Sequence, residues 1–126
     1  MDMQKFKSAY SESRNGANKM FRHPLVRKFI YSDGVQECAD AGLYWMLDIL
    51  ATEGVAHMKK RPNDGLMVVY FSAYADRSAI ITGTLTDDDP TPWMRKVAST
   101  DCEPGQWTFY MAYDGEHYSL ILPSEY

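Results

Sequence analysis

The sequence has few cysteines and no long apolar run, and both absences exclude classes of protein. Its two cysteines, Cys38 and Cys102, form no CxxC pair and no disulfide framework. Cys38 falls inside a helical pattern, so we expect a buried, reduced thiol there. No apolar run approaches the roughly 18 residues that a membrane span requires. Met1–Tyr10 also lacks the apolar segment of a signal peptide. The sequence therefore predicts a soluble cytoplasmic protein with no membrane partner.

Motifs for the common chemistries are missing as well. The sequence has no glycine-rich phosphate loop, nucleophile elbow or paired-carboxylate arrangement. The three histidines, His23, His57 and His117, lack the spacing of metal ligands. A nucleophilic Cys38 would need His57 or His23 beside it, but Cys38 falls on the apolar side of its predicted helix. The pattern favours a protein without cofactor, metal or catalytic activity, and leaves an enzyme as the alternative.

Charge is unevenly distributed along the 126 residues, whose formal net charge is −4. Residues 1–30 carry +5, residues 31–83 carry −3 and residues 84–126 carry −6. A basic N-terminal end and an acidic C-terminal end either attract each other or bind separate partners. Apolar residues make up 45% and aromatic residues 13% of the chain, which is typical of one packed domain over residues 1–126.

The N-terminal third predicts one short helix followed by an extended arm. Met3–Ser11 places Phe6 and Tyr10 four residues apart on an apolar stripe. Asparagine and glycine in residues 11–20 then break the helical pattern. Residues 24–32 (PLVRKFIYS) begin with proline and contain aromatic and branched residues, so we expect a strand or a packed arm.

A long amphipathic helix is the strongest local signal in the chain. Asp33 is the expected N-cap, and Gln36 three residues later completes a capping-box pattern. Gly54 either ends the helix or bends it, and Pro62 closes the segment. Polar residues recur at three- and four-residue steps, so we expect one exposed stripe on an otherwise buried helix. The stripe consists of Glu37, Asp40, Tyr44, Asp48 and Thr52.

Two strands and a long connection follow the helix. Residues 66–73 and 78–86 are rich in β-branched and aromatic residues, and residues 74–77 are a turn that would join them as a hairpin. The polar residues 86–105 form a connection, with a short helix expected over Trp93–Ala98.

A second hairpin is predicted at the C-terminal end. Asp114 and Gly115 stand between two alternating apolar segments, which indicates a two-residue type I′ turn that pairs Tyr113 with Glu116. This register gives one core face. Its members are Trp107, Phe109, Met111, Tyr118, Leu120 and Leu122. The elements together predict an α+β fold, with an antiparallel sheet of about four strands in two hairpins and the long helix packed on one face.

Three segments resemble an uncharacterised family, a domain of unknown function found in phage, plasmid and bacterial genomes. They are His23–Gln36 (HPLVRKFIYSDGVQ), Gly42–Leu50 (GLYWMLDIL) and Leu120–Tyr126 (LILPSEY). The order of elements is similar over most of the chain, whereas residues 87–93 (DDDPTPW) have no counterpart in the family pattern. The resemblance implies a mobile-element context, and hence the cytoplasm of a host cell. It implies no activity.

The basic arm around His23 is the first candidate for a functional surface. Arg22, Arg27 and Lys28 flank the histidine, which indicates a contact with phosphate or nucleic acid, or a general base. The alternative is an ordered arm whose histidine caps or hydrogen-bonds the fold. This alternative is favoured because the rest of the chain lacks interleaved basic residues and the net charge is negative.

The connection before Trp93 is the second candidate. Asp87, Asp88 and Asp89 form an acidic run, but three successive acids cannot all face one cation, so a solvated loop is favoured. Trp93 follows two prolines, and a large aromatic residue on a stiffened loop is typical of an interface anchor. Alternatively, Trp93 folds back onto the core.

The leading hypothesis is a non-enzymatic interaction protein of a phage or mobile element. It would bind and inhibit a host protein or ribonucleoprotein complex, as an anti-CRISPR or other anti-defence inhibitor does. The predicted contact residues are Trp93, Asp87, Asp88, Asp89, Arg22, His23, Arg27 and Lys28. One alternative is an enzyme or small-ligand-binding protein with a pocket between helix and sheet, lined by Tyr44, Asp48 and His57. The other is nucleic-acid binding through the basic N-terminal third.

Overall fold

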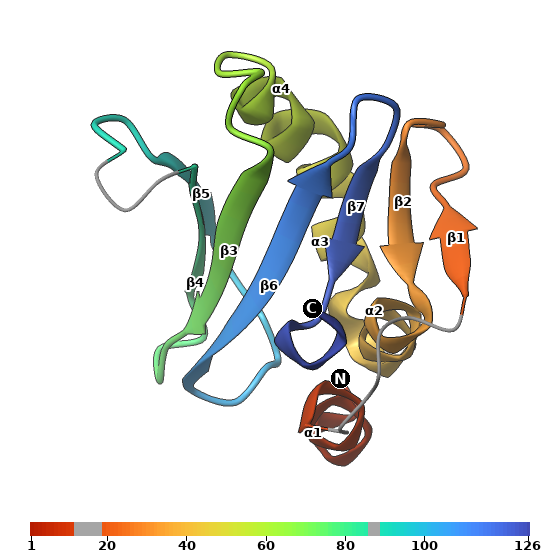
Figure 1. Cartoon of the computed structure of the whole chain (residues 1–126). Coiled ribbons are helices and arrows are strands. Elements are labelled where there is room, and N and C mark those ends of the chain that lie inside the picture. Colours follow the sequence, from red (N-terminus) through yellow and green to blue (C-terminus); the bar gives the residue numbers. More distant parts are fainter. Residues whose placement is uncertain (12–18, 86–88) are drawn as a thin grey trace.

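A computed structural model of the chain describes residues 1–11, 19–85 and 89–126 (Figure 1). Asp87, Asp88 and most of the predicted break after the first helix lie outside these residues. The helical elements are α1 (Met3–Ser11), α2 (Asp33–Cys38), η1 (Ala39–Leu43), α3 (Tyr44–Ile49), η2 (Leu50–Gly54), α4 (Val55–Met58) and η3 (Pro123–Glu125). The strands are β1 (Met20–Arg22), β2 (Phe29–Ser32), β3 (Leu66–Ala73), β4 (Ala79–Thr84), β5 (Trp93–Val97), β6 (Gly105–Tyr113) and β7 (Tyr118–Ile121).

The sheet has seven strands in the order β1-β2-β7-β6-β3-β4-β5, so the prediction of about four antiparallel strands was wrong. The four predicted strands, β3, β4, β6 and β7, form its centre. The sheet is mixed because β2 pairs in parallel with β7, placing Ile30 opposite Ser119. The extended segment predicted over residues 24–32 is a strand only at Phe29–Ser32, and residues 24–28 form bends and a turn. The pairing of β2 with β7 was not predicted, because partners so far apart in sequence leave no local signal.

One of the two outer strands, β5, replaces the short helix expected over Trp93–Ala98, and that prediction was wrong. Its register sets Trp93 opposite Gly83 and Arg95 opposite Ile81. The pairing satisfies backbone groups along one edge of β4 that would otherwise lack partners. A five-residue segment with a tryptophan and a valine has little intrinsic preference of its own, so the neighbouring strand decides its conformation.

The C-terminal hairpin has a four-residue loop instead of the predicted two-residue type I′ turn. Tyr113 pairs with Tyr118, and the Asp114 carboxylate accepts hydrogen bonds from the backbone N–H groups of Glu116 at 2.9 Å and His117 at 2.7 Å. A register error of two residues keeps every side chain on its predicted face. All six residues of the predicted core face are accordingly buried, which confirms that face.

The long helix runs from α2 to α4, with its N-cap one residue earlier than predicted. The Ser32 hydroxyl caps it by accepting from the backbone N–H of Val35 at 3.1 Å. Gly54 has helical dihedral angles and neither ends nor breaks the run. The break falls at Gly42, whose φ is +134°. All five residues of the predicted polar stripe are exposed, which confirms the orientation of the helix.

The core lies between the sheet and the helical run, which covers one side of the sheet (Figure 1). Its largest fully buried side chains come from both layers: Phe6, Phe29, Phe71, Phe109, Leu43, Met46, Leu50, Met67, Ile81, Met111, Leu120 and Leu122. The predicted helix α1 is confirmed with its residue bounds, and Phe6 packs on Trp107 with ring centroids 5.1 Å apart.

The other side of the sheet, here called the open face, is not covered by the helical run. Strand register assigns it these residues: Met20, Arg22, Ile30, Leu66, Val68, Tyr70, Ser72, Ile80, Thr82, Thr84, Met94, Lys96, Gln106, Thr108, Tyr110, Ala112, Ser119 and Ile121. Tyr126 contacts this face, with its ring centroid 5.0 Å from that of Tyr110. None of these strand residues is acidic, although the chain as a whole is.

Candidate functional site

His23 organises the loop between β1 and β2. Its side chain is 5% exposed, and its Nδ1 atom accepts hydrogen bonds from the backbone N–H groups of Leu25 and Val26, both at 3.1 Å. Its Nε2 atom lies 2.7 Å from a carboxylate oxygen of Asp48 on α3. Because Nδ1 is an acceptor, the ring proton resides on Nε2 and is donated to Asp48.

This hydrogen bonding determines what His23 can do chemically. A general base needs a free nitrogen lone pair within reach of a substrate, and both ring nitrogens of His23 are already engaged by the protein. The arrangement is the ordered arm that the sequence favoured, in which the histidine hydrogen-bonds the fold.

The loop held by His23 presents an exposed leucine, with three exposed basic residues close to it in the sequence. Leu25 is 86% exposed, and Arg22, Arg27 and Lys28 are exposed as well. A further backbone hydrogen bond joins Phe29 N–H to the Val26 carbonyl at 3.0 Å. We call Leu25, Arg22, Arg27 and Lys28 the loop surface. Its backbone is ordered before any partner arrives, which lowers the entropic cost of binding.

The long helix adds an aromatic residue to the same neighbourhood. Asp48, which holds His23, is 72% exposed at its side chain, and Tyr44 is 68% exposed. Residues four apart on a helix are neighbours, so Tyr44 lies one turn from the residue that holds the loop. Both side chains are largely exposed, whereas one hypothesis from the sequence placed them in a pocket between helix and sheet.

Asp89 has a structural role at the start of the connection to β5. Its side chain is 1% exposed, and its carboxylate accepts from the backbone N–H groups of Leu85 at 3.1 Å and Thr91 at 3.0 Å. The hydrogen bond from Leu85 is the main cause that lowers the pKa of Asp89 below its ordinary value. His57 is buried, with Nε2 3.6 Å from the same carboxylate.

Trp93 is half-buried and lies on the helix side of the sheet. Its ring covers Gly83, where an added Cβ would meet the ring at 3.0 Å, so the glycine makes room for it. The side chain therefore packs in part against the core. Its contact with a partner stays a prediction.

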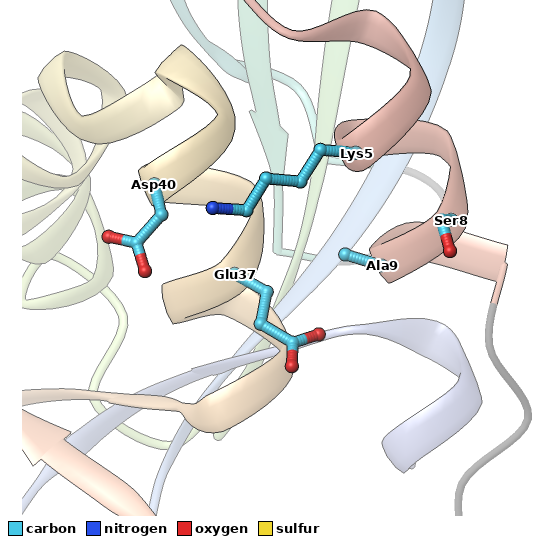
Figure 2. Close-up of a pocket in the computed structure, with 5 residues that line it drawn as sticks. All are labelled: Lys5, Ser8, Ala9, Glu37 and Asp40. Carbon is cyan, nitrogen blue, oxygen red and sulfur yellow. The ribbon is translucent and has the colours of Figure 1, made fainter.

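A hollow of about 450 Å³ lies between α1 and the start of the helical run (Figure 2). Lys5, Ser8 and Ala9 line it from α1, and Glu37 and Asp40 line it from the opposite side. Figure 2 shows the Lys5 side chain reaching across toward the two carboxylates. Because its walls carry charges of both signs, the hollow does not select a ligand of one charge.

Neither thiol is placed for nucleophilic chemistry. Cys38 and Cys102 are both buried, as predicted for Cys38, and burial raises the pKa of Cys102 to about 11. Within residues 1–11, 19–85 and 89–126, no three His, Cys, Asp or Glu side chains are grouped so as to hold a metal ion. In the same residues, no helix has the length and apolar character needed to cross a membrane.

Of the three segments that resemble a known family, the first contacts both of the others in the fold. His23 of the first segment bonds Asp48 of the second. The Ser32 hydroxyl, also of the first, donates to the buried Glu125 carboxylate of the third at 2.5 Å. An added Cβ on Gly34 would lie 2.7 Å from that carboxylate, so the glycine permits the approach.

A comparison with family models agrees with the resemblance seen in the three segments. A model described as a family of unknown function, DUF6876, matches residues 5–126. The chain belongs to this family. No curated protein and no solved structure matches the chain. The family description names no activity.

Sequence reasoning found the basic residues of the loop surface but missed Leu25. The available signal was a pair of apolar residues, Leu25 and Val26, between a proline and a basic pair. The expectation of a strand or packed arm over residues 24–32 hid this signal, because either would bury apolar side chains. The exposure itself depends on the His23 hydrogen bonds, which link residues 25 positions apart.

Proposed function

We propose that this protein is a binding protein that recognises a macromolecular partner through the loop surface and catalyses no reaction. The observation that carries the proposal is the 86% exposure of Leu25 on a loop ordered by His23. Burying a leucine side chain contributes roughly 1.5–3 kcal/mol. An apolar anchor on a preorganised loop is what a binding hot spot requires.

The charges around Leu25 indicate the chemistry of the partner. Arg22, Arg27 and Lys28 stand on an otherwise acidic protein, so the loop surface is complementary to an acidic surface and would steer it into place. A protruding leucine needs an apolar recess, which protein surfaces provide more readily than a nucleic-acid backbone does. We therefore favour an acidic protein surface with an apolar recess, and direct nucleic-acid binding is the competing proposal.

The more specific proposal is that the partner is a host protein or ribonucleoprotein complex and that binding inhibits it. The protein would then act in the host cytoplasm as an anti-CRISPR or other anti-defence inhibitor of a phage or mobile element. The mobile-element context implied by the sequence resemblance supports this proposal. Occupying a surface also requires no catalytic group, in keeping with the engaged nitrogens of His23.

Quantitative capture from host lysate tests the loop surface. The immobilised protein is compared with its Leu25→Ser and Arg27→Glu variants, and Tyr74→Ser serves as a control that removes another exposed apolar side chain. We expect one complex that the wild type and the control retain and that both loop variants lose. Nuclease treatment of the lysate should not release it. Activity of the captured complex is then measured with and without added protein.

Each of the other outcomes decides against part of the proposal. Equal capture by Leu25→Ser and the wild type would remove the loop surface as the contact. Loss of capture with Trp93→Ala alone would move the contact to the connection between β4 and β5. Release by nuclease, together with binding to free DNA or RNA that weakens steeply with salt, would favour the nucleic-acid alternative.

A further inference from the structure

A second hollow lies at the end of the sheet opposite to the loop surface. Its volume is about 470 Å³, which is within the roughly 300–1,000 Å³ of typical ligand pockets. Its walls are mostly apolar and come from the start of β4 and the end of β5: Ser78, Ala79, Ile80, Lys96, Val97 and Ala98. Ile80 and Lys96 are paired across the two strands and belong to the open face.

The charge at this hollow is positive. Lys96 is exposed, and no carboxylate of the described residues lies within ion-pair distance of its ammonium group. Arg95 faces the other side of the sheet and pairs with Glu53 of the helical run. In the adjoining turn, Asp76 and Arg77 are both exposed and opposite in charge, and the Asp76 carboxylate accepts from the Ser78 hydroxyl at 2.6 Å. The pKa of Asp101 is lowered chiefly by a hydrogen bond from the N-terminal ammonium group, and also by the positive charge of Arg77. Among the described residues, Lys96 has no ion-pair partner, so it contributes a positive charge beside an apolar hollow.

We propose that this hollow is a docking site for a segment of a protein partner that carries a large apolar side chain next to a carboxylate. The apolar side chain fills the space between Ile80 and Ala98, and the carboxylate pairs with Lys96. A small number of polar groups around an apolar pocket is the usual arrangement of a specific site. This site is separate from the loop surface, because β1 and β5 are the two outer strands of the sheet.

Two other occupants fit the hollow less well. A second copy of this chain packed by its own open face would bring no Asp or Glu side chain to Lys96 from its strands. A nucleic acid would supply a phosphate for Lys96, but the lining has no aromatic side chain on which a base could stack. A protein segment supplies both the apolar group and the carboxylate.

The test uses a display library of random linear peptides selected on the immobilised protein. Selected peptides are synthesised, and their affinities are measured by fluorescence anisotropy. Ala98→Phe fills the hollow from an exposed position and Lys96→Glu reverses its charge, so neither variant disturbs the core. Leu25→Ser and Tyr74→Ser are the controls. Urea denaturation of each variant verifies that the fold is intact.

We expect the selected peptides to place Asp or Glu beside a large apolar residue. Ala98→Phe and Lys96→Glu should each weaken their binding by roughly tenfold, and both controls should bind as the wild type does. Leu25 belongs to the loop surface and not to this hollow. If the loop surface binds no partner, the expected peptide binding at the hollow therefore stays the same. The proposal is overturned if no peptide is enriched, if the peptides are neutral or basic, or if both hollow variants keep full affinity. A dimer of the wild type that Ala98→Phe dissociates would also overturn it.

Discussion

Replacing His23 by alanine should destabilise the protein by about 4 kcal/mol. The change removes the acceptor of two backbone N–H groups, of Leu25 and Val26, and the donor to Asp48. Each of these three hydrogen bonds contributes roughly 1 kcal/mol. The ring also packs edge-on against Phe29, with centroids 6.1 Å apart, which adds about 0.5–1.5 kcal/mol. A small domain has only roughly 5–15 kcal/mol of stability in total, so the loss would be large.

Two matched variants separate the contributions. His23→Asn keeps a short acceptor near the position of Nδ1 but does not reach Asp48, so we expect a loss of about 1–2 kcal/mol. Asp48→Ala removes only the bond to Nε2. Its carboxylate is mostly exposed and water can replace it, so the loss should be about 1 kcal/mol or less. The expected order of destabilisation is His23→Ala, then His23→Asn, then Asp48→Ala.

Urea denaturation followed by circular dichroism gives the free energy of unfolding of each variant, and amide hydrogen exchange reports on the loop itself. Loss of the His23 side chain should speed exchange at Leu25 and Val26 by roughly thirtyfold, since two hydrogen bonds of about 1 kcal/mol are removed. The reasoning would be refuted if His23→Ala cost no more than Asp48→Ala. Unchanged exchange at the two amides would refute it equally, even with a lower overall stability.

Three further predictions concern the rest of the fold. Gly42→Ala should lower the free energy of unfolding by about 1–3 kcal/mol, because the φ of Gly42 is +134°. Gly54→Ala, at a helical position, should change the free energy of unfolding far less, and the urea concentrations at the midpoints of unfolding compare the two variants. Backbone N–H groups of His117 and its neighbour lower the pKa of Asp114, so its ionised form favours the folded state. That contribution is complete above the ordinary Asp pKa of about 3.9 and is lost as the pH falls through the lowered value; Asp114→Asn should flatten this part of an acid titration of stability. The raised pKa of Cys102, about 11, predicts that a thiol reagent at neutral pH modifies it only after denaturation, and rapid labelling of the folded protein would contradict this.

The sequence alone determined the features that depend on local periodicity. Polar residues at three- and four-residue steps identified the exposed stripe of the long helix. Alternation in the last two long strands identified six core residues, although the hairpin register was wrong by two positions. These predictions succeeded because a period of 3.6 or 2 residues can be recognised from residues close together in the sequence. A register error of two residues in the connecting loop also leaves each side chain on the same face.

Local sequence patterns did not identify how distant segments meet. The parallel pairing of β2 with β7 and the strand character of β5 depend on partners that no local pattern identifies. The same holds for the proposed surfaces. The exposure of Leu25 follows from a histidine held by a carboxylate 25 residues away, and the hollow beside Lys96 requires β4 and β5 to lie side by side. The physical reason is that such contacts arise from the packing of the whole chain, whereas composition and spacing report only what neighbours in the sequence prefer.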